Sequence, residues 1–105
     1  MTLPSWFRRL PFGQPTAPWV LYTRPGCTLC DELAGAAVQL GLVAAEQIRF
    51  IDVDGDRALK KRHGLRLPVL EVGGTEVFAG RYDGGRKKEL VRAIRAASRS
   101  WRSNR

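Results

Sequence analysis

The chain has 105 residues, a formal net charge of +8 at pH 7, and 44% hydrophobic residues. That length allows one small domain with a modest core. No apolar run approaches the ~20 residues that a membrane-spanning helix needs, so no association with a membrane is expected. The first eighteen residues contain four prolines and no continuous apolar segment, which is atypical of a secretory signal peptide. We therefore expect a cytoplasmic protein and, as the default, a monomer.

The composition divides the chain into three parts. Residues 1–18 form an extension in which prolines alternate with aromatic side chains, and prolines exclude a long helix or a central strand there. Residues 19–98 carry the periodic patterns of one folded domain. Residues 99–105 are expected to be a basic tail that continues the last helix.

The first predicted elements meet at two cysteines. An apolar strand is expected over Trp19–Thr23, and the Pro25-Gly26 pair ends it. Cys27 and Cys30 follow at CxxC spacing, and a helical pattern begins at once. Because residues three apart lie on one face of a helical turn, the two sulfurs can meet. This arrangement predicts a redox-active dithiol.

The surroundings of the dithiol predict different roles for its two thiols. Unpaired N–H groups at the helix start favour a thiolate at Cys27, and Arg24 adds a positive charge nearby. Asp31 and Glu32 stabilise the helix start and oppose a second thiolate at Cys30. We therefore expect Cys27 to be the exposed nucleophile and Cys30 the buried resolving thiol.

Three other interpretations of the cysteines are less favoured: ordinary core residues, a zinc site and a structural disulfide. The CxxC spacing at a strand–helix junction argues against ordinary core residues. A closed zinc site takes four ligands, whereas the chain offers two cysteines and one histidine, His63, in a different predicted helix. A structural disulfide would suit a secreted protein. No metal site is predicted.

Two helices and a strand follow from the spacing of apolar residues. The first helix should run from Thr28 to about Gly41, and the second strand over Ile48–Val53. A short helix should begin after Asp56 as N-cap and end with Gly64 at the C′ position. The expected buried stripe of the first helix is Leu29, Leu33, Ala36 and Leu40.

The rest of the chain predicts a hairpin and a last helix. The Gly73-Gly74 pair between residues 67–72 and 75–78 indicates a tight turn between two strands. The last helix should span Gly84 to about Arg102. Its expected core face is Leu90, Ile94, Ala97 and Trp101, and its basic face is Lys88, Arg92, Arg95, Arg99 and Arg102. That basic face could bind an anionic partner.

The segment from Tyr22 to Cys30 resembles the active-site segment of glutaredoxins. There too, an aromatic strand end, a basic residue and a proline lead into a dithiol motif. The resemblance extends over about Trp19 to Ser98 and is nearest to small bacterial glutaredoxin-like proteins of unassigned substrate. It implies an α/β thioredoxin-like fold of order β-α-β-α-β-β-α, with a four-stranded mixed sheet and helices on both faces. Right-handed crossovers are expected from the first strand to the second and from the second to the third.

The resemblance implies a glutathione-linked thiol–disulfide oxidoreductase with Cys27 and Cys30 as catalytic residues. It places a cis bond at Leu67-Pro68 beside the dithiol. It also assigns Arg24, Leu67, Pro68, Gly80 and Asp83 to substrate or glutathione binding, although Ala79 stands where glutaredoxins commonly have glycine. Asp83 is also expected as an N-cap of the last helix. No cofactor is required, and glutathione is the expected co-substrate. The partner is glutathione or a protein disulfide. Two alternatives stay open: an iron–sulfur cluster held across a dimer, and an anion- or nucleic-acid-binding module.

Overall fold

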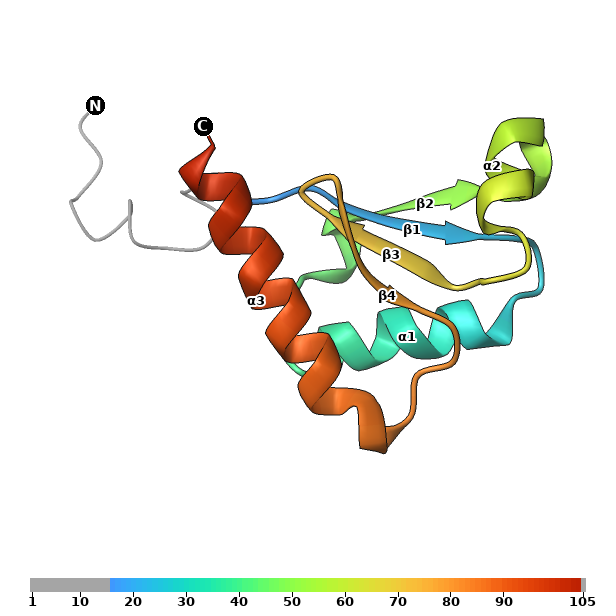
Figure 1. Cartoon of the computed structure of the whole chain (residues 1–105). Coiled ribbons are helices and arrows are strands. Elements are labelled where there is room, and N and C mark those ends of the chain that lie inside the picture. The colour runs from blue at the N-terminus through green and yellow to red at the C-terminus, as the bar shows by residue number, and fades with distance from the viewer. Residues whose placement is uncertain (1–15, 105) are drawn as a thin grey trace, which may run out of the picture.

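The computed structural model describes residues 16–104. The helices and strands follow the predicted order β-α-β-α-β-β-α (Figure 1). They are β1 (Trp19–Thr23), α1 (Thr28–Gln39), β2 (Ile48–Asp52), α2 (Arg57–His63), β3 (Val69–Val72), β4 (Thr75–Ala79) and α3 (Lys87–Ser103). Short 3₁₀ turns, η3 (Ala45–Gln47), η4 (Val53–Gly55) and η5 (Gly84–Arg86), precede β2, α2 and α3.

The four strands form one mixed sheet in the order β2-β1-β3-β4. The expected α/β fold class is confirmed: α1 and α3 cover one face of this sheet, and α2 lies on the other (Figure 1). Strands β1 and β2 are parallel and joined through α1, as predicted. The expected crossover from the second strand to the third was wrong, because β3 runs antiparallel to β1. The connection through α2 therefore reverses the chain direction.

The main core lies between the sheet and the pair α1 and α3. Its fully buried members include Leu21, Leu33, Leu70, Val72 and Leu90. A smaller cluster of Tyr22, Val53 and Val69 packs under α2. Because β1 contributes to both clusters, its near-continuous apolar character is explained by burial on both faces.

The buried stripe of α1 differs from the expected one. Its buried residues are Cys30, Leu33 and Ala37, whereas Ala36 is only half-buried. The apolar spacing alone assigned Cys30 no packing role. The buried face is therefore rotated by about one residue from the expected one, with Cys30 in place of Leu29 and Ala37 in place of Ala36. The packing that holds the helix against the core also anchors the sulfur of Cys30.

The hairpin and the last helix were predicted correctly. Gly73 and Gly74 connect β3 to β4 with φ values of 61° and 82°, the left-handed region that two-residue turns require. A Cβ at Gly73 would lie 2.8 Å from the Cβ of Trp101, so this turn is also pressed against α3. Leu90, Ile94 and Ala97 form the buried face of α3, with Trp101 packed against the core.

Gly64 ends α2, but not in the predicted C′ role. Its φ and ψ of −57° and −30° are right-handed helical values that any residue adopts. The constraint is space, because a Cβ there would lie 2.5 Å from the carbonyl oxygen of Lys60 and 3.3 Å from Nη2 of Arg24. Asp56 is the N-cap of α2, as expected, and accepts a 3.1 Å hydrogen bond from the N–H of Leu59.

The division into an extension, a domain and a tail stays a prediction. Residues 1–15 of the predicted extension lie outside the described residues, whereas Ala17 is already part of the core. Within residues 16–104, no helix combines the length and the apolar character that crossing a membrane would require.

Candidate functional site

The two cysteines lie at the start of α1 and form a disulfide. Cys27 is the N-cap of the helix, and Cys30 lies in its first turn, with 5.3 Å between their Cα atoms. The backbone N–H of Cys30 donates a 3.2 Å hydrogen bond to Sγ of Cys27. This N–H belongs to the first turn and has no carbonyl partner within the helix. It would therefore stabilise negative charge on Sγ of Cys27 when the disulfide is reduced.

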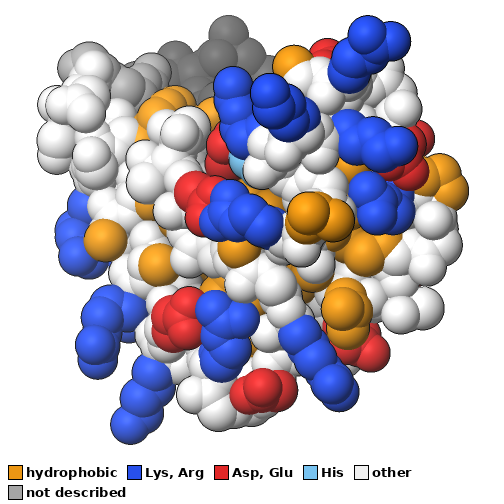
Figure 2. Space-filling model, turned by 45° about the vertical axis from the view of Figure 1, so that its right-hand side comes forward, with side chains coloured by type: hydrophobic (Ala, Val, Ile, Leu, Met, Phe, Trp, Pro, Cys, Tyr) orange, Lys and Arg blue, Asp and Glu red, His pale blue; other side chains and the backbone are white. Residues whose placement is uncertain are grey.

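The two thiols differ in exposure. Cys30 is completely buried, whereas Cys27 is half-buried and faces a groove of about 320 Å³. The groove is lined by Arg24, Pro25, Gly26, Cys27, Thr28, Leu29, Gly64, Leu65 and Leu67. Leu65 is fully exposed at this end of the molecule. Hydrophobic side chains surrounded by Lys and Arg are exposed on the face that turns this end forward (Figure 2). A molecule in solution can therefore reach the sulfur of Cys27 but not that of Cys30.

Arg24 lies in the groove with its charge already paired. Its Nη2 is 3.2 Å from Oδ1 of Asp54, and both side chains are a little over one-third exposed. Asp52 accepts a hydrogen bond from the N–H of Asp54 in the turn after β2. The pairing of Asp54 with Arg24 was not predicted from the sequence. No local pattern could reveal a contact between residues thirty positions apart.

The Leu67-Pro68 bond is cis, as expected. It comes directly before β3, with Leu67 in the groove and Pro68 buried. The N–H of Gly80 donates to the carbonyl oxygens of both Arg66 and Pro68, at 3.1 and 2.8 Å. The segment that carries the cis bond is therefore tied to the end of β4.

Gly80 and Asp83 are not among the residues that line the groove. The N–H of Gly80 is engaged as described. The carboxylate of Asp83 accepts a 2.8 Å bond from the N–H of Gly85 and so caps the turn before α3. The structure thus brings together Arg24, Cys27 and Leu67 at the groove. Gly80 and Asp83 lie outside the groove, in the loop between β4 and η5.

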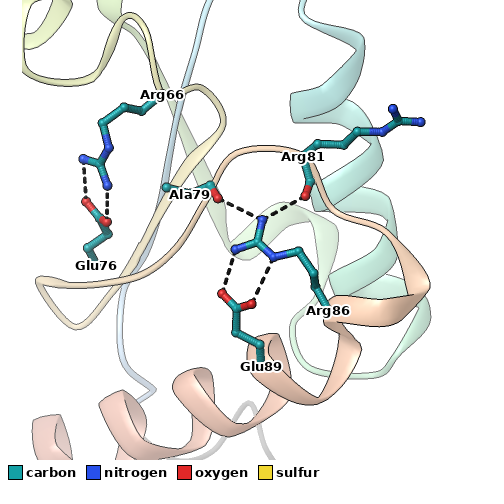
Figure 3. Close-up of polar contacts among 6 residues, drawn as sticks. All are labelled: Arg66, Glu76, Ala79, Arg81, Arg86 and Glu89. Atoms are coloured by element: carbon teal, nitrogen blue, oxygen red, sulfur yellow. Dashed lines mark hydrogen bonds and ion pairs between the residues drawn. The ribbon is translucent and has the colours of Figure 1, made fainter.

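Arg86 holds this loop in place (Figure 3). Its Nη1 donates to the carbonyl oxygens of Ala79 and Arg81 at 3.1 and 2.9 Å, and its guanidinium lies 3.9 Å above the ring of Phe78. Two further hydrogen bonds, of 3.0 and 2.7 Å, join it to Glu89. These bonds lower the pKa of the Glu89 carboxyl. The role of Arg86 was not predicted from the sequence, because it depends on carbonyl groups of the neighbouring loop.

An aromatic pair lies under α2. The rings of Tyr22 and His63 stack with centroids 4.3 Å apart. The hydroxyl of Tyr22 donates a 3.1 Å hydrogen bond to Glu71, and burial, followed by the contacts with this carboxylate, raises the pKa of Tyr22. His63 is only 3% exposed, and neither of its ring nitrogens has a hydrogen-bond partner in the described part of the chain.

Replacing His63 by Phe should raise the free energy of unfolding by about 1 kcal/mol. An unpaired buried polar group costs ~1–3 kcal/mol, and phenylalanine keeps the stacking on Tyr22 without that cost. Urea denaturation would measure the difference, with His63→Ala as the control that loses stability through a cavity. A loss of stability in His63→Phe would show that the imidazole nitrogens make bonds in solution.

Metal ligands do not gather among the described residues. Within residues 16–104 no group of three or more His, Cys, Asp or Glu side chains could hold a metal ion.

Comparisons with known proteins agree with this geometry. The family model of the glutaredoxin-like domain (DUF836) matches residues 19–95. The X-ray structure of target protein XcR50 from X. campestris is 33% identical, with a TM-score of 0.57, over 71% of this chain and 96% of that one. The solution structure of protein Ne2328 from Nitrosomonas europaea is 26% identical, with a TM-score of 0.57, over 69% and 87%.

A more distant match shares the fold alone. The crystal structure of a buckwheat glutaredoxin–glutathione complex is 20% identical, with a TM-score of 0.53, over 77% of this chain and 79% of that one. No curated protein matches the chain.

Proposed function

Since this chain belongs to the glutaredoxin-like domain family, we propose that it is a thiol–disulfide oxidoreductase that uses Cys27 and Cys30. One observation carries the proposal: an accessible sulfur and a fully buried sulfur form a disulfide across the first turn of a helix. A structural disulfide needs no such asymmetry. An exchange reaction does, because one sulfur must meet the substrate and the other must wait for the mixed disulfide.

The reaction proceeds in two exchanges. The thiolate of Cys27 attacks one sulfur of a substrate disulfide, that S–S bond breaks, and the departing thiolate takes a proton from solvent. The thiol of Cys30 then loses its proton and attacks Sγ of Cys27. The second substrate thiolate leaves and takes up the proton that Cys30 released, and the protein holds the Cys27–Cys30 disulfide. The substrate has gained two electrons and two protons, and two external thiols return them to the protein.

Apolar surface around Cys27 supports binding of a disulfide flanked by apolar groups. Leu29, Leu65 and Leu67 all line the groove. The pairing of Arg24 with Asp54 leaves part of the guanidinium exposed, so that it can meet a substrate carboxylate at the rim. The roles of Arg24, Leu67 and Pro68 in binding are part of this proposal.

Glutathione is the proposed thiol donor, bound weakly. The net charge of +8 draws in an anionic tripeptide, and Arg24 offers it a cation beside Cys27. Two groups that the family resemblance assigns to glutathione are engaged within the protein, however: the N–H of Gly80 and the carboxylate of Asp83. These engagements are the physical reason to expect low affinity.

We expect glutathione to bind the Cys30→Ser variant with a dissociation constant on the order of millimolar, about −4 kcal/mol. NMR titration should shift resonances near Arg24 and Leu67. Arg24→Ala should weaken binding several-fold, and Asp83→Ala less, because Asp83 lies outside the groove. Saturation below ~10 μM, or no shift near Arg24 at millimolar glutathione, would contradict this expectation.

A pair of assays tests the proposed reaction. One follows glutathione-dependent reduction of a small mixed disulfide, and the other follows insulin reduction with thioredoxin and its reductase as the reference. The wild type should be active in at least one, and Cys27→Ser in neither. Inactivity of the reduced, folded wild type in both assays would contradict the proposed oxidoreductase function. Activity with insulin alone would retain the reaction and replace glutathione with a protein dithiol.

A further inference from the structure

The helix α3 carries a basic face that the dithiol chemistry does not use. At 100° per residue, its five cations fall within an arc of about 80° and repeat every ~4.5–6 Å over about 21 Å. All five side chains are exposed. They are Lys88, Arg92, Arg95, Arg99 and Arg102.

None of these five cations forms an ion pair with a described residue. Among residues 16–104 the ion pairs join Arg24 to Asp54, Arg66 to Glu76 and Arg86 to Glu89. The one acid of α3, Glu89, is therefore already held by Arg86. Much of the net charge of +8 is thus concentrated, unneutralised, along one side of one helix.

Two shallow grooves run along this face. One, of about 330 Å³, is lined by Lys87, Lys88, Val91, Arg92, Arg95 and Arg99. The other, of about 390 Å³, lies between α3 and the residues after α1, with Arg95, Arg99 and Arg102 along it. Figure 1 shows α3 on the side of the molecule away from the β1–α1 turn. A partner on α3 would therefore leave Cys27 accessible.

The kinds of side chain on this face argue against two of the polyanions that could bind it. An anionic membrane would favour apolar side chains that enter it, but within residues 16–104 the exposed large hydrophobic residues are Val38, Phe50 and Leu65, none of them on α3. Single-stranded nucleic acid would favour exposed aromatic rings for stacking, but the one aromatic of α3, Trp101, packs against the core.

The regularly spaced phosphates of a duplex backbone fit the regularly spaced cations of this face. Four of the five cations are arginines, whose planar guanidinium binds phosphate through two N–H groups. The small side chains of Ala96 and Ser103 flank the stripe and let a backbone approach closely. We propose that the basic face of α3 is a sequence-independent binding surface for the phosphate backbone of a nucleic acid duplex. This proposal does not depend on the redox function.

Fluorescence anisotropy with a labelled 20-base-pair DNA duplex and the oxidised full chain tests it. At ~50 mM salt we expect a dissociation constant on the order of 10 μM, and a slope of log K against log salt of about −4. Charge reversal of Arg92, Arg95 and Arg99 to Glu should weaken binding at least ~30-fold. The matched control reverses Lys60, Lys61 and Arg62, which are exposed on α2, and should weaken it less than ~3-fold.

Three results would overturn the proposal. They are no binding at ~50 mM salt, an equal loss in the two charge-reversed variants, and binding to phosphatidylserine vesicles but not to the duplex. If the charge-reversed α3 variant does not fold by circular dichroism, Gln replaces Glu at the same three positions. The salt slope must then become shallower by about 2.7, and an unchanged slope contradicts the proposal equally.

Discussion

The Cys30→Ser variant is expected to accumulate a mixed disulfide at Cys27, whereas Cys27→Ser should form none. Loss of the attacking thiolate should lower the exchange rate by roughly 10³-fold or more, because the one remaining cysteine, Cys30, is completely buried in the folded protein. Cys30→Ser keeps the attack but removes internal resolution. Mass spectrometry after reaction with a small disulfide would separate the two outcomes.

Burial provides the control for this experiment. Cys30 is completely buried, so the unfolded Cys27→Ser protein should react at Cys30 while the folded one does not. Formation of a mixed disulfide at Cys30 in the folded protein would reverse the assigned roles. Failure of the Cys30→Ser protein to form any mixed disulfide, under conditions in which the wild type is oxidised, would remove Cys27 as nucleophile.

Gly64→Ala should lower the free energy of unfolding by about 2 kcal/mol, as overpacking at a buried site typically does. The cost does not come from the backbone conformation, since φ at Gly64 is −57°. It comes from placing a methyl group 2.5 Å from the carbonyl oxygen of Lys60 and 3.3 Å from Nη2 of Arg24. Denaturant titration with an unchanged m-value would measure it.

Two further variants identify the cause of this loss. Gly35→Ala in α1 has open space around the new methyl group and should gain about 0.5–1 kcal/mol, the usual helix preference of alanine over glycine. Combining Gly64→Ala with Arg24→Ala removes only the contact with Nη2, so most of the loss should persist. Full recovery in that double variant would make Arg24 the obstacle, and wild-type stability of Gly64→Ala would exclude the close contact altogether.

Local patterns accounted for the fold and the reactive pair. The apolar run of Trp19–Thr23, the Pro-Gly breaker and the CxxC spacing placed a dithiol at a strand–helix junction, where the structure has it. The 4, 3, 4 spacing of apolar residues in α3 and the Gly73-Gly74 pair likewise gave the last helix and the hairpin. Such signals depend on neighbouring residues, because helical period and turn conformation are properties of short segments.

Contacts between distant segments decided the rest. The rotation of the buried stripe of α1 toward Cys30, the pairing of Arg24 with Asp54, and the reason for glycine at position 64 all depend on what another element places beside them. The loop after β4 is the clearest case. The family resemblance assigned Gly80 and Asp83 to glutathione binding, with Asp83 also expected as the N-cap of the last helix. In the fold, the N–H of Gly80 holds the cis-proline segment, and the carboxylate of Asp83 caps the turn before α3. A hydrogen-bonding group free in sequence is free in the protein only if the packed chain leaves it without an internal partner.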